Sequence, residues 1–419
     1  MNEVNNEKAT PATNTGKLTA AYTDSTAGRI PIIAITGTNG KTTTTRLTAA
    51  IVGQARYKVG FTCSDGIYIQ DELVETGDCS GPASARVVLN NPTVNYAVLE
   101  CARGGMLRAG LAFSQCDVAI ITNVAEDHLN LDGIDTIEKL AAVKMKVAQT
   151  VAPSGYAVLN AGDDLVYAMH QSLSCHIAYF SMDGTSPRIQ EHVAAGGVAC
   201  VPYNGGIVIL KGAEKIEVAR ILDIPITFSG KARFNTANVL AATLATYLQG
   251  ISVTIIKEAL QAFVPSAERT PGRMNSFEFN DFTIMIDFAH NPHGFRAIAS
   301  YIASIPATVK VGIIAGTGDR RDEDIISLAE EAAKIFDELI IRQDVSFRGR
   351  PGNEIIELVL QGIRNIDPEK KTIVIEKEKE AVDYAIKNAR KGSLILLTSD
   401  KIMDAVQYVK ELKAKEDNT

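Results

Sequence analysis

One short segment limits the folds open to this chain more than any other. An apolar run, IPIIAIT (30–36), leads directly into GTNGKTTTT (37–45), and helical spacing then continues to position 52. Gly37 and Gly40 permit the tight turn in which successive backbone N–H groups point at phosphate oxygens. A helix that begins there adds the positive end of its dipole. The segment therefore predicts a buried strand, a phosphate-binding loop and a helix within an α/β fold.

The loop is a shortened form of the P-loop. The pattern G-x-x-x-x-G-K-[ST] requires glycine at position 35, where this chain has Ile35. Lys41 can bring its charge to the β- and γ-phosphates of ATP, and the hydroxyl of Thr42 can ligate Mg²⁺. The alternative, a glycine-rich turn with a chance lysine, does not account for strand, loop and helix in this order. The residues expected to bind ATP here are Gly37, Thr38, Asn39, Gly40, Lys41, Thr42 and Thr43.

The α/β pattern extends through the first two thirds of the chain. Residues 1–28 have little apolar periodicity and are expected to form a flexible leader or linker. Periodicity predicts strands at 96–100, 117–123 and 156–160, helices at 134–151, 234–248 and 252–263, and several short strands between about 177 and 228.

A second α/β rhythm follows SAERTPGRM (266–274), where Pro and Gly interrupt the helical pattern. Strands are expected at 284–289, 309–316, 338–343, 372–376 and 393–399, and each of the first four precedes a helical stretch. Such alternation predicts a mostly parallel sheet covered by helices. With 419 residues, more than one domain is expected. We predict a leader (1–28), a central P-loop domain (29–268) and a C-terminal Rossmann-like domain (269–419).

Composition excludes several classes of function. The formal charge of −7, with no dense basic stripe, argues against nucleic-acid binding. No apolar run is long enough for a membrane span, and the N-terminus lacks the apolar core of a signal peptide. The six cysteines are scattered without a C-x-x-C pair, as is typical of reduced thiols. A cytoplasmic protein without membrane contact is expected.

Metal ligands for the P-loop should lie at the ends of neighbouring strands. Glu100 closes the strand 96–100, and Asp127 and His128 come just after the strand 117–123. In a parallel sheet these strand ends face the crevice beside the P-loop. Taken singly, Asp127 could be a helix cap, His128 an exposed ring and Glu100 a solvated carboxylate. Together with the loop, they favour a nucleotide–metal site.

Several motifs resemble, in content and order, those of the Mur ligase family, which includes the muramoyl-peptide ligases and folylpolyglutamate synthetase. They are ITGTNGKTTTTRL, LECARGGMLRAGLAF, TNVAEDHL, LAAVK, FNTAN, ERTPGRM and IDFAHNPHG. Within the family the chain is most similar to the Mur-ligase-like half of the cyanophycin synthetases, through SDGIYI, GDCSGPASA, RGGMLRAGLAF, TGDRRDEDI and RGRPG. The resemblance covers about residues 28–400.

The resemblance assigns roles around ATP and one or two Mg²⁺ ions. It implies that Thr42, Glu100 and His128 bind metal, with Asn123 and Asp127 in the same phosphate-side shell. Lys144 matches a lysine that is often carbamylated to hold a second Mg²⁺; the alternative is a solvent-facing lysine on a helix. The implied catalytic residues are Lys41, His128, Lys144 and Arg273.

The resemblance also implies the remaining nucleotide contacts. Asn235 and Asn238 match residues on the adenine side, and Arg273 matches an arginine that reaches the phosphates from the C-terminal domain. Asp287 matches the acid that holds the ribose, with His290 and Asn291 near the nucleotide. In a purely structural interpretation, Asp287 and Asn291 would instead cap the helix that follows.

The implied activity is ATP-dependent amide formation. ATP phosphorylates an acceptor carboxylate, and an amino-acid amine displaces the phosphate. By resemblance to the cyanophycin synthetases, arginine or a similar amino acid would be joined to an aspartate side chain of an acidic peptide or polymer. Asp344, Arg348 and Arg350 are expected to meet the amino acid. Contacts to the acceptor are expected from Ser64, Asp65, Arg103 and Arg108.

Two further interpretations remain open at the level of sequence. The chain could be a catalytically inactive nucleotide-binding partner of an ATP-grasp or Mur-type system, or a P-loop kinase or switch NTPase. No ATP-grasp half is seen, so a separate ATP-grasp protein is a possible partner. The resemblance further predicts a homo-oligomer.

Overall fold

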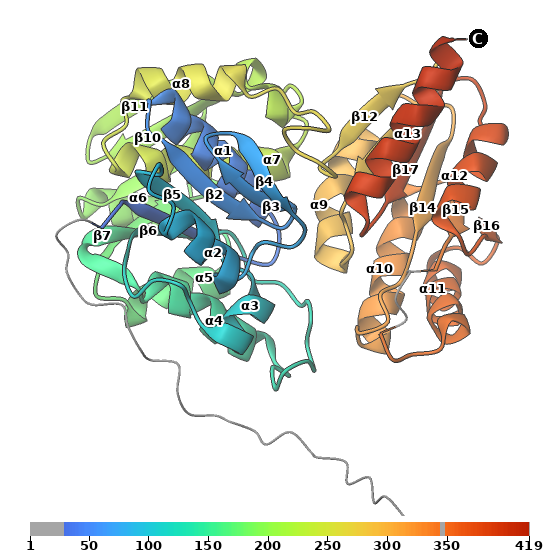
Figure 1. Ribbon diagram of the computed structural model, residues 1–419, viewed down its shortest axis with the longest axis horizontal. Helices are drawn as coiled ribbons and strands as arrows, with labels where there is room; N and C mark the ends of the chain where they lie inside the picture. The colour runs from blue at the N-terminus through green and yellow to red at the C-terminus, as the bar shows by residue number, and fades with distance from the viewer. Residues whose placement is uncertain (1–28, 344–347, 419) are drawn as a thin grey trace, which may run out of the picture.

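The structure of the protein, a computed structural model, describes residues 29–343 and 348–418. The predicted leader (1–28) lies outside this described part. Figure 1 shows two α/β units side by side, one around a large sheet and the other around a smaller one. The predicted fold class, a mostly parallel P-loop domain followed by a second α/β domain, is confirmed.

The first sheet has eleven strands and a parallel centre. Its spatial order is β11 (Glu214–Arg220), β10 (Gly206–Lys211), β9 (Val198–Tyr203), β8 (His176–Phe180), β7 (Val151–Asn160), β6 (Cys116–Ile121), β1 (Ile32–Thr36), β5 (Tyr96–Glu100), β2 (Val59–Cys63), β3 (Gly66–Ile69) and β4 (Glu72–Thr76). Neighbouring strands from β9 to β2 are parallel, whereas β10, β11, β3 and β4 are antiparallel additions. The carboxyl ends of β1, β5 and β6 therefore reach the same edge of the sheet.

Helices cover both faces of this sheet, which explains the continuous apolar run of β1. Ile33 and Ile35 pack into the core formed with α1 (Lys41–Gln54), α7 (Arg233–Leu248) and α8 (Val253–Ala262). Ile32 and Ala34 point to the opposite core. The helices on that side are α2 (Pro82–Leu89), α3 (Arg103–Ala109), α4 (Ile137–Ala148), α5 (Asp164–Ala168) and α6 (Pro187–Ala194). A strand buried on both faces needs no polar alternation.

The second sheet has six strands. Its order is β12 (Asn275–Glu278), β13 (Phe282–Asp287), β17 (Ser393–Thr398), β14 (Lys310–Ile314), β15 (Glu338–Ile341) and β16 (Lys371–Val374). Only β12 pairs antiparallel. One face packs against α9 (Pro292–Ala303), α10 (Asp322–Ile335) and α11 (Gly352–Ile366), and the other against α12 (Glu378–Lys387) and α13 (Ile402–Asp417). The four strands expected to precede a helix do so: β13, β14, β15 and β16 are followed by α9, α10, α11 and α12.

The structure corrects one predicted helix and adds elements that the pattern did not predict. The helix expected at 134–151 is shorter, because the Thr136 hydroxyl accepts the Lys139 N–H as a cap (3.2 Å) and Val151 already belongs to β7. The strands β2, β3 and β4 were not predicted, because their antiparallel pairing interrupts the strand–helix alternation.

The segment between Ala262 and Asn275 connects the two sheets, and the proposed domain boundary at 268/269 lies within it. Across residues 29–343 and 348–418, no helix combines the length and apolar character that crossing a membrane requires.

Candidate active site

The loop after β1 has a backbone path that only glycine accommodates at two points. Gly37 and Gly40 have φ values of 152° and 85°, and a Cβ atom at either position would collide with Thr122 or Asn238. The end of β6 holds the loop in place: the Thr38 N–H donates to the Asn123 carbonyl (2.9 Å), and the Thr122 hydroxyl donates to the Asn39 carbonyl (2.7 Å). The loop is thus built against the neighbouring strand, as a rigid anion cradle requires.

Four side chains meet at the first turn of α1, and we call them the Thr42 cluster. The Thr42 hydroxyl donates to the Glu100 carboxylate (2.9 Å) and lies 2.9 Å from the Ser64 hydroxyl. Arg273, from the second unit, donates to both hydroxyls, at 3.2 Å to Thr42 and 3.3 Å to Ser64. Lys41 begins the same helix and donates to the Thr38 carbonyl (2.8 Å). Two cations, two hydroxyls and one carboxylate therefore surround the mouth of the loop.

The donor set of the Thr42 cluster fits Mg²⁺. The ion prefers hard oxygen ligands, and Thr42 and Glu100 offer a hydroxyl and a carboxylate within hydrogen-bond distance of each other. Glu100 is only 2% exposed, and this burial raises its pKa even though Lys41 and Arg273 act in the opposite direction. A divalent cation beside the carboxylate would remove that cost of burying its charge.

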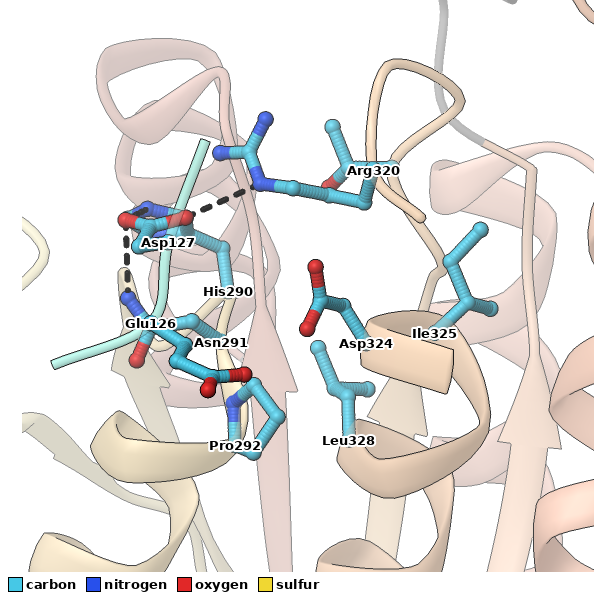
Figure 2. A pocket seen from close by; sticks show the side chains of 10 residues that line it. Glu126, Asp127, His290, Asn291, Pro292, Arg320, Asp324, Ile325 and Leu328 are labelled. Carbon is cyan, nitrogen blue, oxygen red and sulfur yellow. Dashed lines mark hydrogen bonds and ion pairs between the residues drawn. The ribbon is translucent and has the colours of Figure 1, made fainter. Parts of the chain in front are cut away.

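A second group forms around Asp127, from the loop after β6. Arg320 donates to the Asp127 carboxylate (2.9 Å), and Asn291 donates to it at 3.1 Å (Figure 2). Arg320 also donates to Nε2 of His128 (2.8 Å). Because an arginine can only donate, His128 accepts here as a neutral ring. Burial lowers the pKa of His128 to about 3. Although burial alone would raise the pKa of the Asp127 carboxyl, its contact with His290 and the charge of Arg320 hold that pKa well below its usual value.

The expected metal residues therefore fall into two groups. Thr42 and Glu100 lie in the Thr42 cluster, whereas His128 lies with Asp127 and His290, whose ligand atoms are within 4.8 Å of one another. The carboxyl ends of β5 and β6 lie at the same edge of the sheet as the P-loop, as predicted. Whether His128 shares a metal with Glu100 stays a proposal.

Lys144 is buried behind the phosphate loop. Its side chain is 3% exposed, and its Nζ donates to the Gly37 carbonyl at 2.7 Å. Burial, assisted by the positive charge of Lys41, holds the pKa of Lys144 well below its usual value. The alternative of a solvent-facing lysine is therefore excluded. A lowered pKa makes this amine easier to deprotonate; the deprotonated amine can attack carbon dioxide, and the charge of Lys41 would favour the negatively charged carbamate.

The residues expected on the adenine side line the back of the loop. Asn238 accepts from the Thr44 hydroxyl (3.3 Å) and donates to Asn235 (3.2 Å), which donates to the Ile226 carbonyl (2.9 Å). Both asparagines are buried on α7. These hydrogen bonds connect α7 to α1. That the two asparagines contact adenine remains a proposal.

Asp287 and Asn291 differ in their local roles. Asn291 caps α9 by accepting from the Gly294 N–H (2.7 Å), so the capping interpretation is right for this residue. Asp287 does not cap the helix: it accepts from the backbone N–H groups of Met274 (3.0 Å) and Ala289 (2.8 Å). The Asp287 carboxylate thereby fixes the chain next to Arg273.

The residues predicted for substrates are spread over both units. Ser64 belongs to the Thr42 cluster, whereas Asp65 forms an ion pair with Arg46 and accepts from the Tyr68 hydroxyl (3.0 Å). Arg103 donates to the Leu131 carbonyl, and Arg108 is exposed on α3.

In the second unit, Arg348 pairs with Asp319 (2.9 Å) and Arg350 with Asp322 (2.6 Å). Asp344 lies outside the described residues. These contacts place both arginines around the start of α10.

Sequence reasoning missed three residues of this region. Arg320 contacts Asp127 and His128, Arg46 contacts Asp65, and Nδ1 of His293 lies 2.8 Å from the Asn39 amide. For Arg320 a signal existed, since this residue lies in TGDRRDEDI, one of the motifs that carry the family resemblance.

Two family models cover most of the chain. The Mur ligase middle domain matches residues 35–246, and the Mur ligase glutamate ligase domain matches residues 272–400. The chain belongs to the Mur ligase family. The two matches follow the two sheets of the fold.

Relatives in the Mur ligase family include cyanophycin synthetases. Those of Geminocystis herdmanii and Synechocystis sp. are each 45% identical, over 93% and 94% of this chain, but only 44% and 45% of their own length is matched. The chain thus spans less than half the length of these relatives. A 2,6-diaminopimelate-adding muramoyl-peptide ligase of Caldanaerobacter subterraneus is 27% identical, over 95% of this chain and 81% of the relative.

Solved structures of the Mur ligase family share the fold. Mycobacterium tuberculosis folylpolyglutamate synthase complexed with ADP matches 91% of this chain and 90% of its own, with a TM-score of 0.68 and 19% identity. E. coli FolC in complex with DHPP and ADP matches 92% and 89%, with a TM-score of 0.67 and 17% identity.

Proposed function

We propose that the chain is an ATP-dependent amide ligase. An acceptor carboxylate attacks the γ-phosphate of ATP, giving an acyl phosphate and ADP. The amine of an amino acid then attacks the acyl carbon, and inorganic phosphate leaves as the amide forms. The single observation that carries the proposal is the Thr42 cluster, in which Arg273 of the second unit reaches the P-loop hydroxyl and Ser64.

The residues present can perform this chemistry. Lys41 and Arg273 supply positive charge where negative charge develops on the transferring phosphoryl group, which is the main catalytic need in such transfers. Thr42 and Glu100 would hold a Mg²⁺ ion, and a second ion would be held through carbamylated Lys144, with His128 as a further ligand. Such ions neutralise phosphate oxygens and polarise the group transferred. Arg273 comes from the other unit, so docking of the units completes the site.

A cleft beside Glu100 offers the acceptor an entrance. Its empty volume is about 210 Å³, and its walls come from the turn before α2, the end of β5 and residues around α3. Because Glu100 lies in its lining, a carboxylate entering here would arrive at the phosphate-transfer centre. We propose an acidic peptide or polymer as acceptor and, by similarity to the cyanophycin synthetases, arginine or a related amino acid as the amine.

The assignment is tested by product formation. The full chain is supplied with ATP, Mg²⁺, a panel of amino acids, and β-aspartyl or glutamyl peptides as acceptors; ADP release and product mass are then measured. Release of ADP that depends on both acceptor and amine, with a product of the expected mass, is the predicted result, and a chelator should abolish it. An inactive partner subunit would bind ATP without such dependence, and a kinase or switch NTPase would transfer phosphate to hydroxyl or water whatever the amine.

Lys144→Ala is expected to lower the rate of ligation by about a hundredfold, because the carbamate that would orient a metal ion is lost. Labelled bicarbonate should mark Lys144 of the wild-type chain, detected by NMR spectroscopy or mass spectrometry without turnover. A small exogenous carboxylate should partly restore the variant. The matched control is Lys146→Ala, an exposed lysine on the same helix. Full activity of Lys144→Ala, or an unlabelled Lys144, would contradict the assignment.

We also propose a cytoplasmic enzyme that assembles as a homo-oligomer and works with a separate ATP-grasp protein. The free cysteines support the compartment, and the similarity to part of the cyanophycin synthetases is the basis for the two partnerships. Co-purification with a candidate ATP-grasp protein and light scattering would test these partnerships.

A further inference from the structure

The two units touch through an apolar contact that involves the segment before α7. The Phe228 ring lies 4.8 Å from the Tyr301 ring of α9, and Ala232 is fully buried in the core of the second unit. Phe234 packs against the same core. Apolar contacts are non-directional and are hardly affected by salt, so this one tolerates a change in the angle between the two units.

A second, polar contact joins the loop after β6 to the start of α10. Arg321 donates to Glu126 at 2.7 Å, and the adjacent Arg320 donates to Asp127 at 2.9 Å. The inner pair is buried, with 5% and 7% side-chain exposure, whereas Glu126 is 56% exposed. Figure 2 shows Glu126 and Asp127 of the first unit facing Arg320 and the start of α10. Residues of both units line a cleft there.

Arg321 is held ready for this contact by its own helix. Its Nε and Nη2 donate to the two carboxylate oxygens of Asp324 at 2.8 and 2.6 Å, and Nη2 also reaches Glu126. A guanidinium fixed in this bidentate way loses little freedom when it meets a partner. The exposed Glu126–Arg321 pair is weak and screened by salt, as suits a contact that opens and closes.

We propose that Glu126 and Arg321 form a releasable interdomain clamp, with Phe228 and Tyr301 as its pivot, and that Arg321 is a positioning residue for the phosphate site. The inference rests on the proposed function. When the clamp is closed, Asn291 bonds Asn39 (3.2 Å) and Arg273 reaches the Thr42 cluster. Because Glu126 directly precedes Asp127 and His128, the contact of Arg321 with Glu126 also fixes the loop that carries these two residues. When it opens, the cleft between the units widens to admit small substrates.

The test compares Glu126→Gln, Arg321→Gln and the double variant, with Glu126→Arg as the strongest disruption. Small-angle X-ray scattering of the full chain gives the radius of gyration, and the KM for ATP is measured in the ligation assay. Glu126→Arg should increase the radius of gyration at low salt, and each single neutral change should raise the KM for ATP about two- to fivefold with kcat nearly unchanged. The double variant should have a KM for ATP no higher than that of Arg321→Gln. High salt should raise the KM of the wild type to the value of the double variant.

Arg296→Gln is the matched control, because Arg296 pairs with Glu331 (3.4 Å) within the second unit and should change neither quantity. An unchanged radius of gyration in Glu126→Arg, or additive effects in the double variant, would overturn the clamp. Glu126 is exposed, so its variants should fold. The scattering result does not depend on turnover and therefore distinguishes failure of the clamp from failure of the proposed ligase activity.

Discussion

Replacement of Lys41 by alanine is expected to lower kcat for amide formation by about a thousandfold. Lys41 is the first residue of α1, and its ammonium is tied to the Thr38 carbonyl within the phosphate loop. That position places a fixed positive charge where the γ-phosphate would lie. The charge counts most in the transition state, so the loss should appear mainly in kcat. The loss in kcat is measured as the rate of ADP release in the presence of acceptor and amine.

A second lysine gives the matched control for Lys41. Lys139 is exposed near the start of α4 and pairs with Asp135 on the surface (2.7 Å), so Lys139→Ala should leave kcat unchanged. Circular dichroism should show an intact fold in both variants. If Lys41→Ala retained more than a tenth of wild-type kcat, the loop would not hold the transferring phosphate, and the site assignment would be wrong.

The sequence was sufficient where a feature is local. The run from Ile32 to Ile35 is buried on both faces of the sheet, so its side chains are continuously apolar and the strand can be predicted without tertiary information. Gly37 and Gly40 are dictated by backbone angles that other residues rarely adopt. Glu100 could be placed at the P-loop edge because parallel strands end at a common edge.

Contacts between elements far apart in the chain were not predictable in the same way. Arg320 lies 193 residues from Asp127, and its role depends on how the two units dock, which no periodicity encodes. The sequence analysis assigns no role to Arg46, yet the structure buries it against Asp65, a residue predicted to bind the acceptor. A residue predicted to bind substrate can thus be held in a structural ion pair, which only the packed structure reveals.

Replacement of Arg273 by alanine is expected to lower kcat by a thousandfold or more, on the order of the loss seen for an arginine finger. Its guanidinium donates to the hydroxyls of Thr42 and Ser64 and lies 4.8 Å from the Phe288 ring. It is the cation that the second unit adds to the site, so its loss should also uncouple domain docking from catalysis. Arg273→Lys should restore little, because a lysine lacks the planar guanidinium that lies over the Phe288 ring while its Nη2 donates to both hydroxyls.

Arg269→Ala provides the matched control for Arg273. Arg269 lies in the same connecting segment, but its side chain is exposed and donates to the Ala262 carbonyl (2.7 Å), away from the Thr42 cluster. Arg269→Ala should have the kcat of the wild type. The thermal unfolding midpoints of Arg269→Ala and Arg273→Ala should be similar. If Arg269→Ala lost as much activity as Arg273→Ala, the defect would come from the connecting segment as a whole. A selective loss in Arg273→Ala would instead require the guanidinium itself at the phosphate, which is what an acyl-phosphate mechanism shared between two domains demands.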